Sequence, residues 1–464
     1  MGNDSLTLFI IVIATFVLCW FSRLKYRSWI LIFSCWMLLS ILNSYAMLLF
    51  GFIALVNFNT TKYLKLNLLA RNTLIVFNIL SLVFIKLLTQ LSPTFSSLGD
   101  LESFLFPVGF SIFIFHQISF IIDLGALNLK KDIELDEYLL FSFFIGNFLT
   151  GPIAKFATFH SQKNSRLILK TSNVAAGVTL IMVGLFKKMV IADNIAPMTR
   201  LLFVSELPSK QNLFFPFLLN KYEIFANFSG FSDVALGVAF IFGIRLPINF
   251  NQPFATTSIR EFWRRWHISL VSWIKEYVFY PMITSPFSIL GVQVITAITF
   301  LIFALWHKLS WNHFCYGLIQ FLLIFAATKW DHLQASISFE KKWLKRIIRP
   351  FKWLWFYVVL ISIPGLLFRS DSISHFTKIL KNLTHIPLKS AFFVFEHYRF
   401  QWFILLFAIS FLEIVQRLIT FERFMTFLLA RSLISRTLIL LSSVFLIALL
   451  CNNAVNTDFI YAKY

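Results

Sequence analysis

The chain has 464 residues, of which 58% are hydrophobic and 13% charged, with 59 Phe and 13 Trp. Soluble domains carry roughly 25% charged residues, so this composition excludes an ordinary soluble protein and indicates an integral membrane protein. The formal net charge of +20 is typical of basic cytoplasmic loops and contact with anionic lipid. It does not favour nucleic-acid binding, because no soluble domain is visible that could carry a nucleic-acid groove.

The apolar residues occur in long blocks without period-2 alternation, which predicts membrane helices and not barrel strands. In chain order the blocks are 6–21, 29–58, 73–91, 104–124, 138–153, 174–192, 214–225, 234–242, 278–289, 292–306, 313–327, 353–368, 402–412 and 438–450. The second block is long enough for two short crossings or one tilted one. We expect an all-α polytopic membrane protein with about 11 transmembrane helices, organised as a single membrane domain over 1–464.

Several blocks hold too few apolar residues for a full crossing at roughly 1.5 Å per residue. They predict re-entrant and interfacial helices. The basic run from Lys341 to Lys352 interleaves six cations with Trp, Leu and Ile, which is typical of an interfacial helix on anionic lipid. Its alternative role is to bind the phosphates of an acyl donor. The four cysteines show no metal or disulfide spacing and are interpreted as small buried hydrophobic residues.

Two histidines, His267 and His307, each directly follow a tryptophan. Around the first, five residues recur at three- and four-residue steps and predict one aromatic helix face; they are Trp263, Trp266, Leu270, Trp273 and Tyr277. Glu261 lies four residues before Arg265, a spacing that predicts an ion pair, and Pro281 predicts the helix end. A hydrogen-bonded structural histidine and a functional one are both open for His267.

His307 follows fifteen uncharged residues, Val292 to Trp306, and is followed by Lys308. Burial and the neighbouring cation both disfavour a protonated ring. A neutral imidazole can take a proton from a hydroxyl group. The spacing alone leaves open whether His307 is catalytic or simply an interfacial histidine at a helix end.

The sequence resembles the membrane-bound O-acyltransferase family, in the bacterial branch typified by alginate O-acetyltransferase. Matching blocks run in the family's order from about 104 to the end of the chain and are strongest over 104–370. They are Thr150–Phe156, Gly184–Asn194, Asn227–Gly237, Pro247–Phe254, Phe262–Leu270 and Leu305–His307, with weaker pieces at Leu367–Arg369 and Phe459–Tyr461.

The resemblance implies many helices around a central tunnel, with the acyl donor entering from the cytoplasmic side and the hydroxyl acceptor from the other. It maps the family's catalytic histidine onto His307 and an accompanying histidine onto His267. His307 would then act as general base on a hydroxyl that attacks a thioester. Candidate oxyanion donors or substrate-binding residues are Trp306, Lys308, Ser310, Asn312, Arg264, Arg265 and Asp233.

Three departures from the family pattern stand out. Lys308 replaces the usual glycine after the catalytic histidine, and Asn227 replaces a common aspartate. A Gly-Gly turn usual after the first histidine block is missing at Met282–Ser285. Asn227 and the missing turn lean toward the branch that transfers D-alanine to teichoic acid. The Gly184–Asn194 block and the doubled Arg264-Arg265 lean toward acetyl transfer, which we favour.

We therefore expect an enzyme of the bacterial cytoplasmic (inner) membrane that moves an acetyl group from a cytoplasmic thioester to a hydroxyl of a cell-envelope polysaccharide or partner transferase. The donor would be acetyl-CoA or a carrier-protein thioester, used as substrate, with no bound metal or cofactor. Expected partners are the lipid bilayer and an extracytoplasmic acyltransferase or small membrane protein. The alternatives are D-alanyl transfer from a carrier protein, a non-catalytic export scaffold, and a proton-coupled transporter.

Overall fold

The computed structural model describes residues 3–63, 67–91, 109–127, 133–144, 146, 151–203, 213–335 and 351–384, with a few short pieces between 408 and 444. These residues are helical almost throughout, as expected, and the described ranges contain one isolated β-bridge, Phe250 to Trp266, and no strand. They pack as two compact units, residues 1–181 with 235–247 and residues 182–234 with 248–464. The expected blocks at 402–412 and 438–450, the basic run 341–350 and the Phe459–Tyr461 piece lie largely or wholly outside the described residues.

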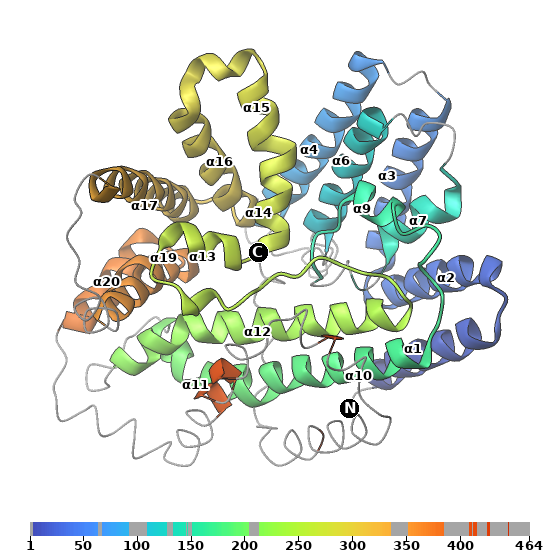
Figure 1. Cartoon of the computed structure of the whole chain (residues 1–464), viewed down its shortest axis with the longest axis horizontal. Helices are drawn as coiled ribbons and strands as arrows, with labels where there is room; N and C mark the ends of the chain where they lie inside the picture. Colours follow the sequence, from blue (N-terminus) through green and yellow to red (C-terminus); the bar gives the residue numbers. More distant parts are fainter. Residues whose placement is uncertain are drawn as a thin grey trace. The chain divides into compact units, whose positions relative to one another are not determined.

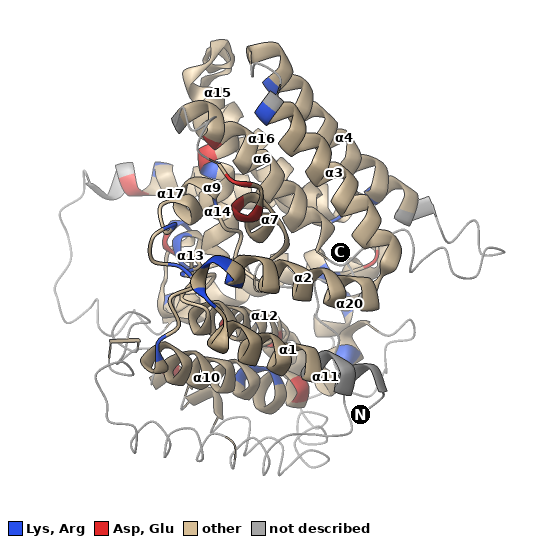
Figure 2. Cartoon of the chain, turned by 90° about the vertical axis from the view of Figure 1, so that its right-hand side faces the viewer, with Lys and Arg blue, Asp and Glu red and all other residues tan. Residues whose placement is uncertain are grey.

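Unit 1 is built from helices that carry apolar side chains on most of their surface. They are α1 (Asn3–Phe21), α2 (Leu24–Leu42), α3 (Ser44–Tyr63), α4 (Leu68–Leu91), α6 (Phe110–Leu127), α7 (Leu135–Phe143) and α9 (Phe156–His160). Figure 2 shows α3 and α4 almost free of charge along their length. Phe52 and Phe84 are 62% and 60% exposed, which suits side chains that face lipid and not water.

Inside unit 1, side-chain amides connect four helices. Asn57 on α3 and Asn78 on α4 exchange hydrogen bonds of 3.1 and 3.0 Å, and Asn57 also donates to Gln117 on α6. The Gln117 amide donates to Ser142 on α7, and its oxygen accepts from Tyr138. All five residues are buried. Each polar group has a partner, which is the condition for burying such groups without a large free-energy cost.

Unit 2 holds the elements that carry the predicted site. In chain order they are η2 (Phe186–Ala192), α11 (Asp193–Arg200), η3 (Leu201–Phe203), most of α12 (Phe214–Ile241), η4 (Pro253–Ala255), α13 (Ile259–Arg265), α14 (Ile268–Ile274), η5 (Lys275–Phe279), α15 (Tyr280–Thr284), η6 (Pro286–Leu290), α16 (Gly291–His307), α17 (Trp311–Ala335), η7 (Phe356–Ser362), α19 (Ile363–Arg369) and α20 (Ile373–Thr384). Figure 1 shows α16 returning beside α14 and α15, with α17 packed against it.

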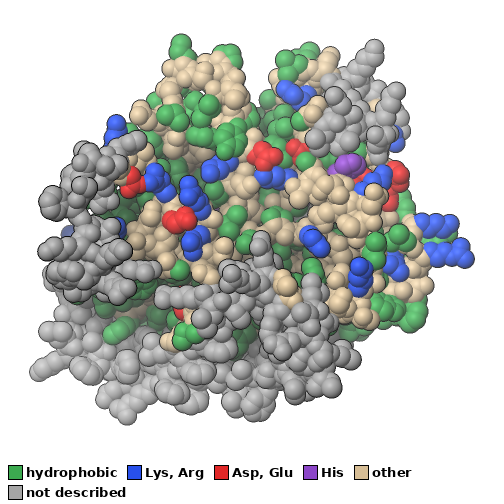
Figure 3. All heavy atoms as spheres, in the orientation of Figure 1, with side chains coloured by type: hydrophobic (Ala, Val, Ile, Leu, Met, Phe, Trp, Pro, Cys, Tyr) green, Lys and Arg blue, Asp and Glu red, His purple; other side chains and the backbone are tan. Residues whose placement is uncertain are grey.

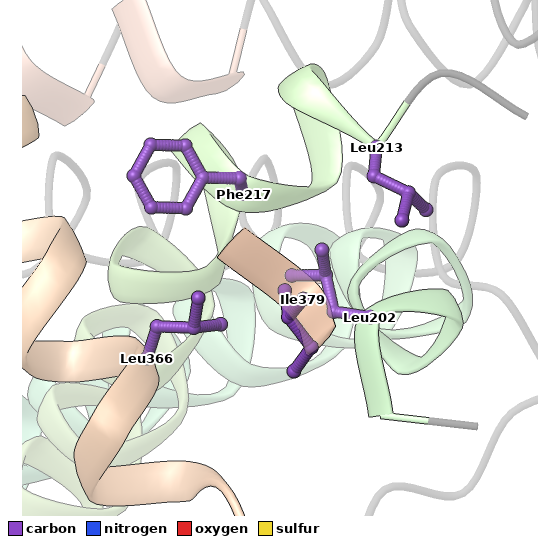
Figure 4. Packing of buried hydrophobic residues seen from close by; sticks show 5 residues of the cluster. All are labelled: Leu202, Leu213, Phe217, Leu366 and Ile379. Carbon is purple, nitrogen blue, oxygen red and sulfur yellow. The ribbon is translucent and has the colours of Figure 1, made fainter. Parts of the chain in front are cut away.

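A hydrophobic cluster anchors α19 and α20 in unit 2. Leu366 and Ile379 pack with Leu202, Leu213 and Phe217, and all five side chains are buried (Figure 4). Burying such side chains contributes roughly 1.5–3 kcal/mol each. The cluster therefore fixes the end of α19, the segment whose next residues reach the site.

Two glycine pairs let helix backbones approach closely. Within unit 1, a Cβ atom on Gly177 of α10 (Thr171–Leu185) would lie 2.6 Å from the Gly237 carbonyl oxygen. Within unit 2, a Cβ atom on Gly230 would lie 2.7 Å from the Gly184 carbonyl oxygen. Both contacts are reciprocal. Only glycine fits at such positions, as at other small-residue contacts between membrane helices.

Seven described helices are long and apolar enough to cross a membrane. The expected number of about 11 stays a prediction, because that count covers only the described residues. One expectation about individual blocks is corrected: the blocks at 214–225 and 234–242 form one continuous helix, α12, since the polar residues between them do not break it. The block at 278–289, expected to be too short for a crossing, forms η5, α15 and η6. Of the two possibilities for the block at 29–58, the structure has two helices.

Candidate functional site

His307 is the last residue of α16, and only 3% of its side chain is exposed. Its ring centroid lies 4.4 Å from that of Trp306 and 5.5 Å from that of Phe303, both on the same helix. The Phe368 ring at the end of α19 lies 5.0 Å away on another side. The sequence places an ionisable ring at the end of an uncharged helix, and the fold encloses that ring in aromatic side chains.

His267 is held by a break in the backbone. The predicted continuous helix from Glu261 to Pro281 is wrong: α13 ends at Arg265, Trp266 is extended, and His267 adopts a left-handed conformation with φ 48°. Asn249 accepts the Ile268 amide at 2.9 Å, and Asn251 donates to the Arg265 carbonyl at 3.0 Å. These bonds replace those that a continuous helix would make at the break. Pro281 does not end the helix, since it lies in the first turn of α15.

His267 is one of three described non-glycine residues with a positive φ, together with Leu167 and Gln252. Histidine adopts it more readily than most non-glycine residues, yet strained backbone clusters at active sites and ligand sites. The His267 ring packs edge-on against Phe228 at 4.8 Å and lies 6.5 Å from the Trp306 ring. Trp306 therefore contacts both histidines and lies between them. Burial lowers the pKa of His267 from 6.5 to about 3, so the ring is neutral at neutral pH.

A third histidine, His313, joins this cluster without having been predicted. It is 1% exposed on α17, its ring lies 4.7 Å from Phe368, and its Nδ1 atom lies 2.9 Å from the Ser310 hydroxyl oxygen. The only signal in the sequence is its position six residues after His307. The cluster of His267, Trp306, His307, His313 and Phe368 is called the histidine cluster below.

Two predicted oxyanion donors are engaged with other groups. The Asn312 amide donates to the Ser370 carbonyl at 2.6 Å, and Ser310 is bonded to His313. Ser310 thus orients a histidine of the cluster, and Asn312 holds the residue after Arg369. Their role as oxyanion donors stays a prediction. Trp306 remains in direct contact with both histidines.

Phe368 is fixed by the residues that follow it. Arg369 pairs with Glu223 on α12, with 2.5 Å between Nη1 and Oε2, and Glu223 also accepts from Thr199 at 2.6 Å. Ser370 is held by Asn312. Glu223 is 2% exposed, and a buried ion pair of this kind is costly to break. The position of the Phe368 ring against His307 is therefore fixed by the buried Arg369–Glu223 ion pair and by the hydrogen bond from the Asn312 amide to the Ser370 carbonyl.

Three further predicted residues have different partners. Arg264 and Arg265 lie 3.6 and 3.7 Å from Glu261, which confirms the predicted Glu261–Arg265 pair. Asp233 lies 2.5 Å from Lys187 in a buried ion pair. The histidine-cluster contacts described above involve none of these three residues, and their role in substrate binding stays a prediction.

The departures from the family pattern are also located. Lys308 is half-buried and extended, with φ −152°, a conformation that any residue adopts. The position does not require glycine, so lysine is accommodated without backbone strain. Asn227 is fully buried on α12, and neither atom of its amide has a hydrogen-bond partner among the described residues. Buried amides of this kind are completed by water or ligand.

Among the described residues, no group of three or more His, Cys, Asp or Glu side chains could hold a metal ion. The three histidines instead contact aromatic rings and a hydroxyl group. The site in the described residues is thus an enclosed histidine and aromatic cluster.

The described helices, seven of them long and apolar enough to cross a membrane, define a polytopic α-helical membrane protein whose unit 2 encloses three histidines. The family model of the membrane-bound O-acyltransferases matches residues 125–368, more than half of the chain. The chain belongs to this family, and the matched range includes all three histidines and Phe368. This confirms the family resemblance, the all-α polytopic fold and the acyltransferase class.

Three relatives illustrate what the chain is similar to. It is 29% identical to a probable alginate O-acetylase of Azotobacter vinelandii over 269 residues, which is 58% of this chain and 52% of that protein. It is 30% identical to a peptidoglycan O-acetyltransferase of Helicobacter pylori over 53% of this chain and 46% of that protein. A teichoic acid D-alanyltransferase of Streptococcus thermophilus is 28% identical over 55% of this chain and 64% of that protein. The chain thus spans about half the length of the first two relatives.

Proposed function

We propose that this membrane protein transfers an acetyl group from a thioester to a hydroxyl group of a cell-envelope polysaccharide or of a partner transferase, with His307 as the general base. The observation that carries the proposal is the enclosure of His307 at the end of a membrane helix, within the part of the chain that matches the family. The names of the acetyl-transferring relatives support the choice of acyl group.

In the chemical step His307 accepts one proton and later returns it. The imidazole of His307 takes the hydroxyl proton as the oxygen attacks the thioester carbonyl, the new C–O bond forms, and the C–S bond breaks. The thiolate then leaves with the proton returned by the ring, giving an ester and a free thiol. The carbonyl end of α16 stabilises the positive charge that the ring carries between these two transfers. The aromatic rings around His307 keep water from competing for the thioester.

The surroundings of the step are part of the same proposal. The donor is acetyl-CoA or a carrier-protein thioester that approaches from the cytoplasm, and the acceptor approaches from the opposite side of the bacterial inner membrane. The reaction uses no resident metal or cofactor. An extracytoplasmic acyltransferase or a small membrane protein passes the acetyl group onward to the polysaccharide.

D-alanyl transfer from a carrier-protein thioester is the second candidate. It is favoured by similarity to teichoic acid D-alanyltransferases and by Asn227, which stands where an aspartate is common in the acetyl branch. The buried amide of Asn227 would suit an acceptor or donor group that both gives and accepts a hydrogen bond.

A donor assay on the purified full chain tests the proposal. The protein in lipid vesicles is incubated with acetyl-CoA or with a D-alanyl carrier-protein thioester, and release of free thiol is measured with a soluble alcohol acceptor. We expect thiol release with acetyl-CoA and its loss in His307→Ala, while Lys329→Ala on the exposed part of α17 behaves as wild type. Release only from the carrier-protein thioester supports the second candidate.

No release from either donor, or equal release by His307→Ala, contradicts the catalytic proposal. The first result favours a non-catalytic export scaffold or a transporter. Proton flux measured in the same vesicles separates these two, because only the transporter would carry protons.

A further inference from the structure

A cavity of about 250 Å³ lies between α13, α14, η5, α16 and α17, all within unit 2. Most of its wall is apolar, with Trp263, Phe300 and Phe303 as the largest side chains. Trp263 packs edge-on against Phe300 at 5.9 Å and Phe303 at 5.0 Å, and its indole nitrogen donates to Gln320 on α17. The aromatic wall is therefore fixed in place.

Three cations line the same cavity: Arg260, Arg264 and Lys275. No acidic residue is among the described residues of its wall, although Arg260 pairs with Asp331 and Arg264 with Glu261 outside it. Lys275 is exposed. The cavity thus combines an apolar wall with positive charge, and it fits a ligand with an apolar tail and an anionic head group.

The α16 side of the cavity lies along a membrane helix. Four residues of α16, between Thr296 and Phe303, line the cavity, and they span about 10 Å of the helix axis. The segment that ends at His307 is among those long and apolar enough to cross a membrane. Figure 3 shows hydrophobic side chains at the surface over α15 and α16, and Val292 and Val294 are 56% and 47% exposed. The cavity is therefore beside a helix surface suited to lipid.

We infer that this cavity binds an anionic phospholipid, with one acyl chain along α16 and the phosphate at Arg264 and Lys275. Basic pockets between membrane helices bind anionic head groups in this way. The site is separate from the histidine cluster but adjoins it, because Phe303 lines the cavity and also contacts the His307 ring. A bound chain would therefore pack against a side chain that contacts His307. The inference does not depend on the acyl group that the protein transfers.

The test uses the purified full chain and native mass spectrometry with two lipids that share acyl chains, dioleoyl phosphatidylglycerol and dioleoyl phosphatidylcholine. We expect phosphatidylglycerol to be retained preferentially. Replacing both Arg264 and Lys275 by alanine should lower that preference by about fivefold for each cation removed. Lys329→Ala removes a cation from α17 that does not line the cavity and should leave the preference unchanged.

A second pair of variants tests the cavity itself. Thr299 lines it and Thr328 does not, and each hydroxyl is bonded to a carbonyl of its own helix, at 2.7 and 2.9 Å. Thr299→Phe fills the cavity and should reduce retention of both lipids at least about fivefold, whereas Thr328→Phe should not. Thr299→Leu fills it less and serves as the milder variant should Thr299→Phe fail to fold.

Three results would overturn the inference. They are equal retention of the two lipids by the wild type, unchanged retention in both Thr299 variants, and displacement of phosphatidylglycerol by acetyl-CoA at equal concentration. The last result would assign the cavity to the thioester donor.

Discussion

The two Trp-His pairs of this chain look alike in sequence but are built differently. Trp306-His307 ends a regular helix, and its histidine is enclosed by rings from α16 and α19. Trp266-His267 lies in a break between α13 and α14, where His267 has φ 48°. One histidine is positioned by side-chain packing and the other by its own backbone. Substitutions at the two positions should therefore fail in different ways.

The largest expected effect is on catalysis at His307. His307→Ala should lower acyl transfer by about 10²–10⁴-fold, the usual contribution of a general base. The protein should still fold, because a helix end accepts alanine. The measurement is ester content of the cell envelope alongside protein level, with His267→Asn as the matched variant. Equal losses of acyl transfer in the two variants, or no loss in His307→Ala, would contradict the difference between the two histidines.

The next effect concerns the ion pair that fixes Phe368 beside His307. Glu223→Gln leaves the partly buried Arg369 without its carboxylate, and breaking a buried pair costs about 3 kcal/mol or more. The melting temperature of the purified protein should fall by several degrees. Glu261→Gln removes a carboxylate of the half-exposed pairs with Arg264 and Arg265 and should cost at most about 1 kcal/mol. Equal losses in the two variants would contradict the assigned role of Glu223.

The backbone of His267 gives a third, smaller effect. A left-handed conformation costs roughly 1–2 kcal/mol for most residues and less for Asn or Gly. His267→Val should therefore lower the melting temperature more than His267→Asn or His267→Gly. At His307, which is helical, the glycine variant should instead have the lowest melting temperature of the three, because glycine is the poorest helix former among them. A similar ranking at both positions would mean that the break is not the feature that fixes His267.

A fourth effect is on the dependence of stability on pH. The folded chain holds the His267 pKa at about 3, below the value of 6.5 for the free side chain. Between these values the unfolded chain binds more protons, so stability is complete above about pH 6.5 and falls as pH is lowered. Thermal unfolding from pH 8 to pH 5 should show this fall, and His267→Asn should reduce its slope. An unchanged slope would indicate that other groups dominate the acid response.

The smallest expected effect is at Lys308. Its extended backbone does not require glycine, so Lys308→Gly should change acyl transfer by no more than about twofold, with a loss of up to about 1 kcal/mol from the added freedom of the unfolded chain. The assay is the thiol-release measurement at several donor concentrations. A large change in the concentration dependence alone would instead assign Lys308 to donor binding.

The sequence was sufficient for the fold class and for the position of His307, and the reason is chemical. An uncharged apolar run followed by Trp-His predicts a membrane helix that ends at an ionisable ring. The sequence could not reveal the break at His267, because the aromatic residues on both sides of it keep a helical period. The backbone groups left without helical partners at the break bond instead to the backbones of Asn249 and Asn251, which lie outside this pattern. The sequence also could not separate Asp233, paired with Lys187, from a substrate ligand, since both uses require a buried carboxylate.

His313 and Glu223 were missed for a related reason. Neither lies in a pattern of its own, and each acquires its role through contacts that only the fold creates, with Phe368 and with Arg369. The Glu261–Arg265 pair was predictable because a four-residue spacing on one helix determines the contact directly.

Phe368, Arg369 and Ser370 contact three different groups in consecutive positions: the His307 ring, the Glu223 carboxylate and the Asn312 amide. A helix turns about 100° per residue, so inserting or deleting one residue before Phe368 would rotate at least two of these groups away from their partners. The three contacts at the end of α19 can therefore form together in only one helical register. Loop grafts, fusions and truncations of this chain should therefore keep the register of these three residues, because keeping every histidine is not enough.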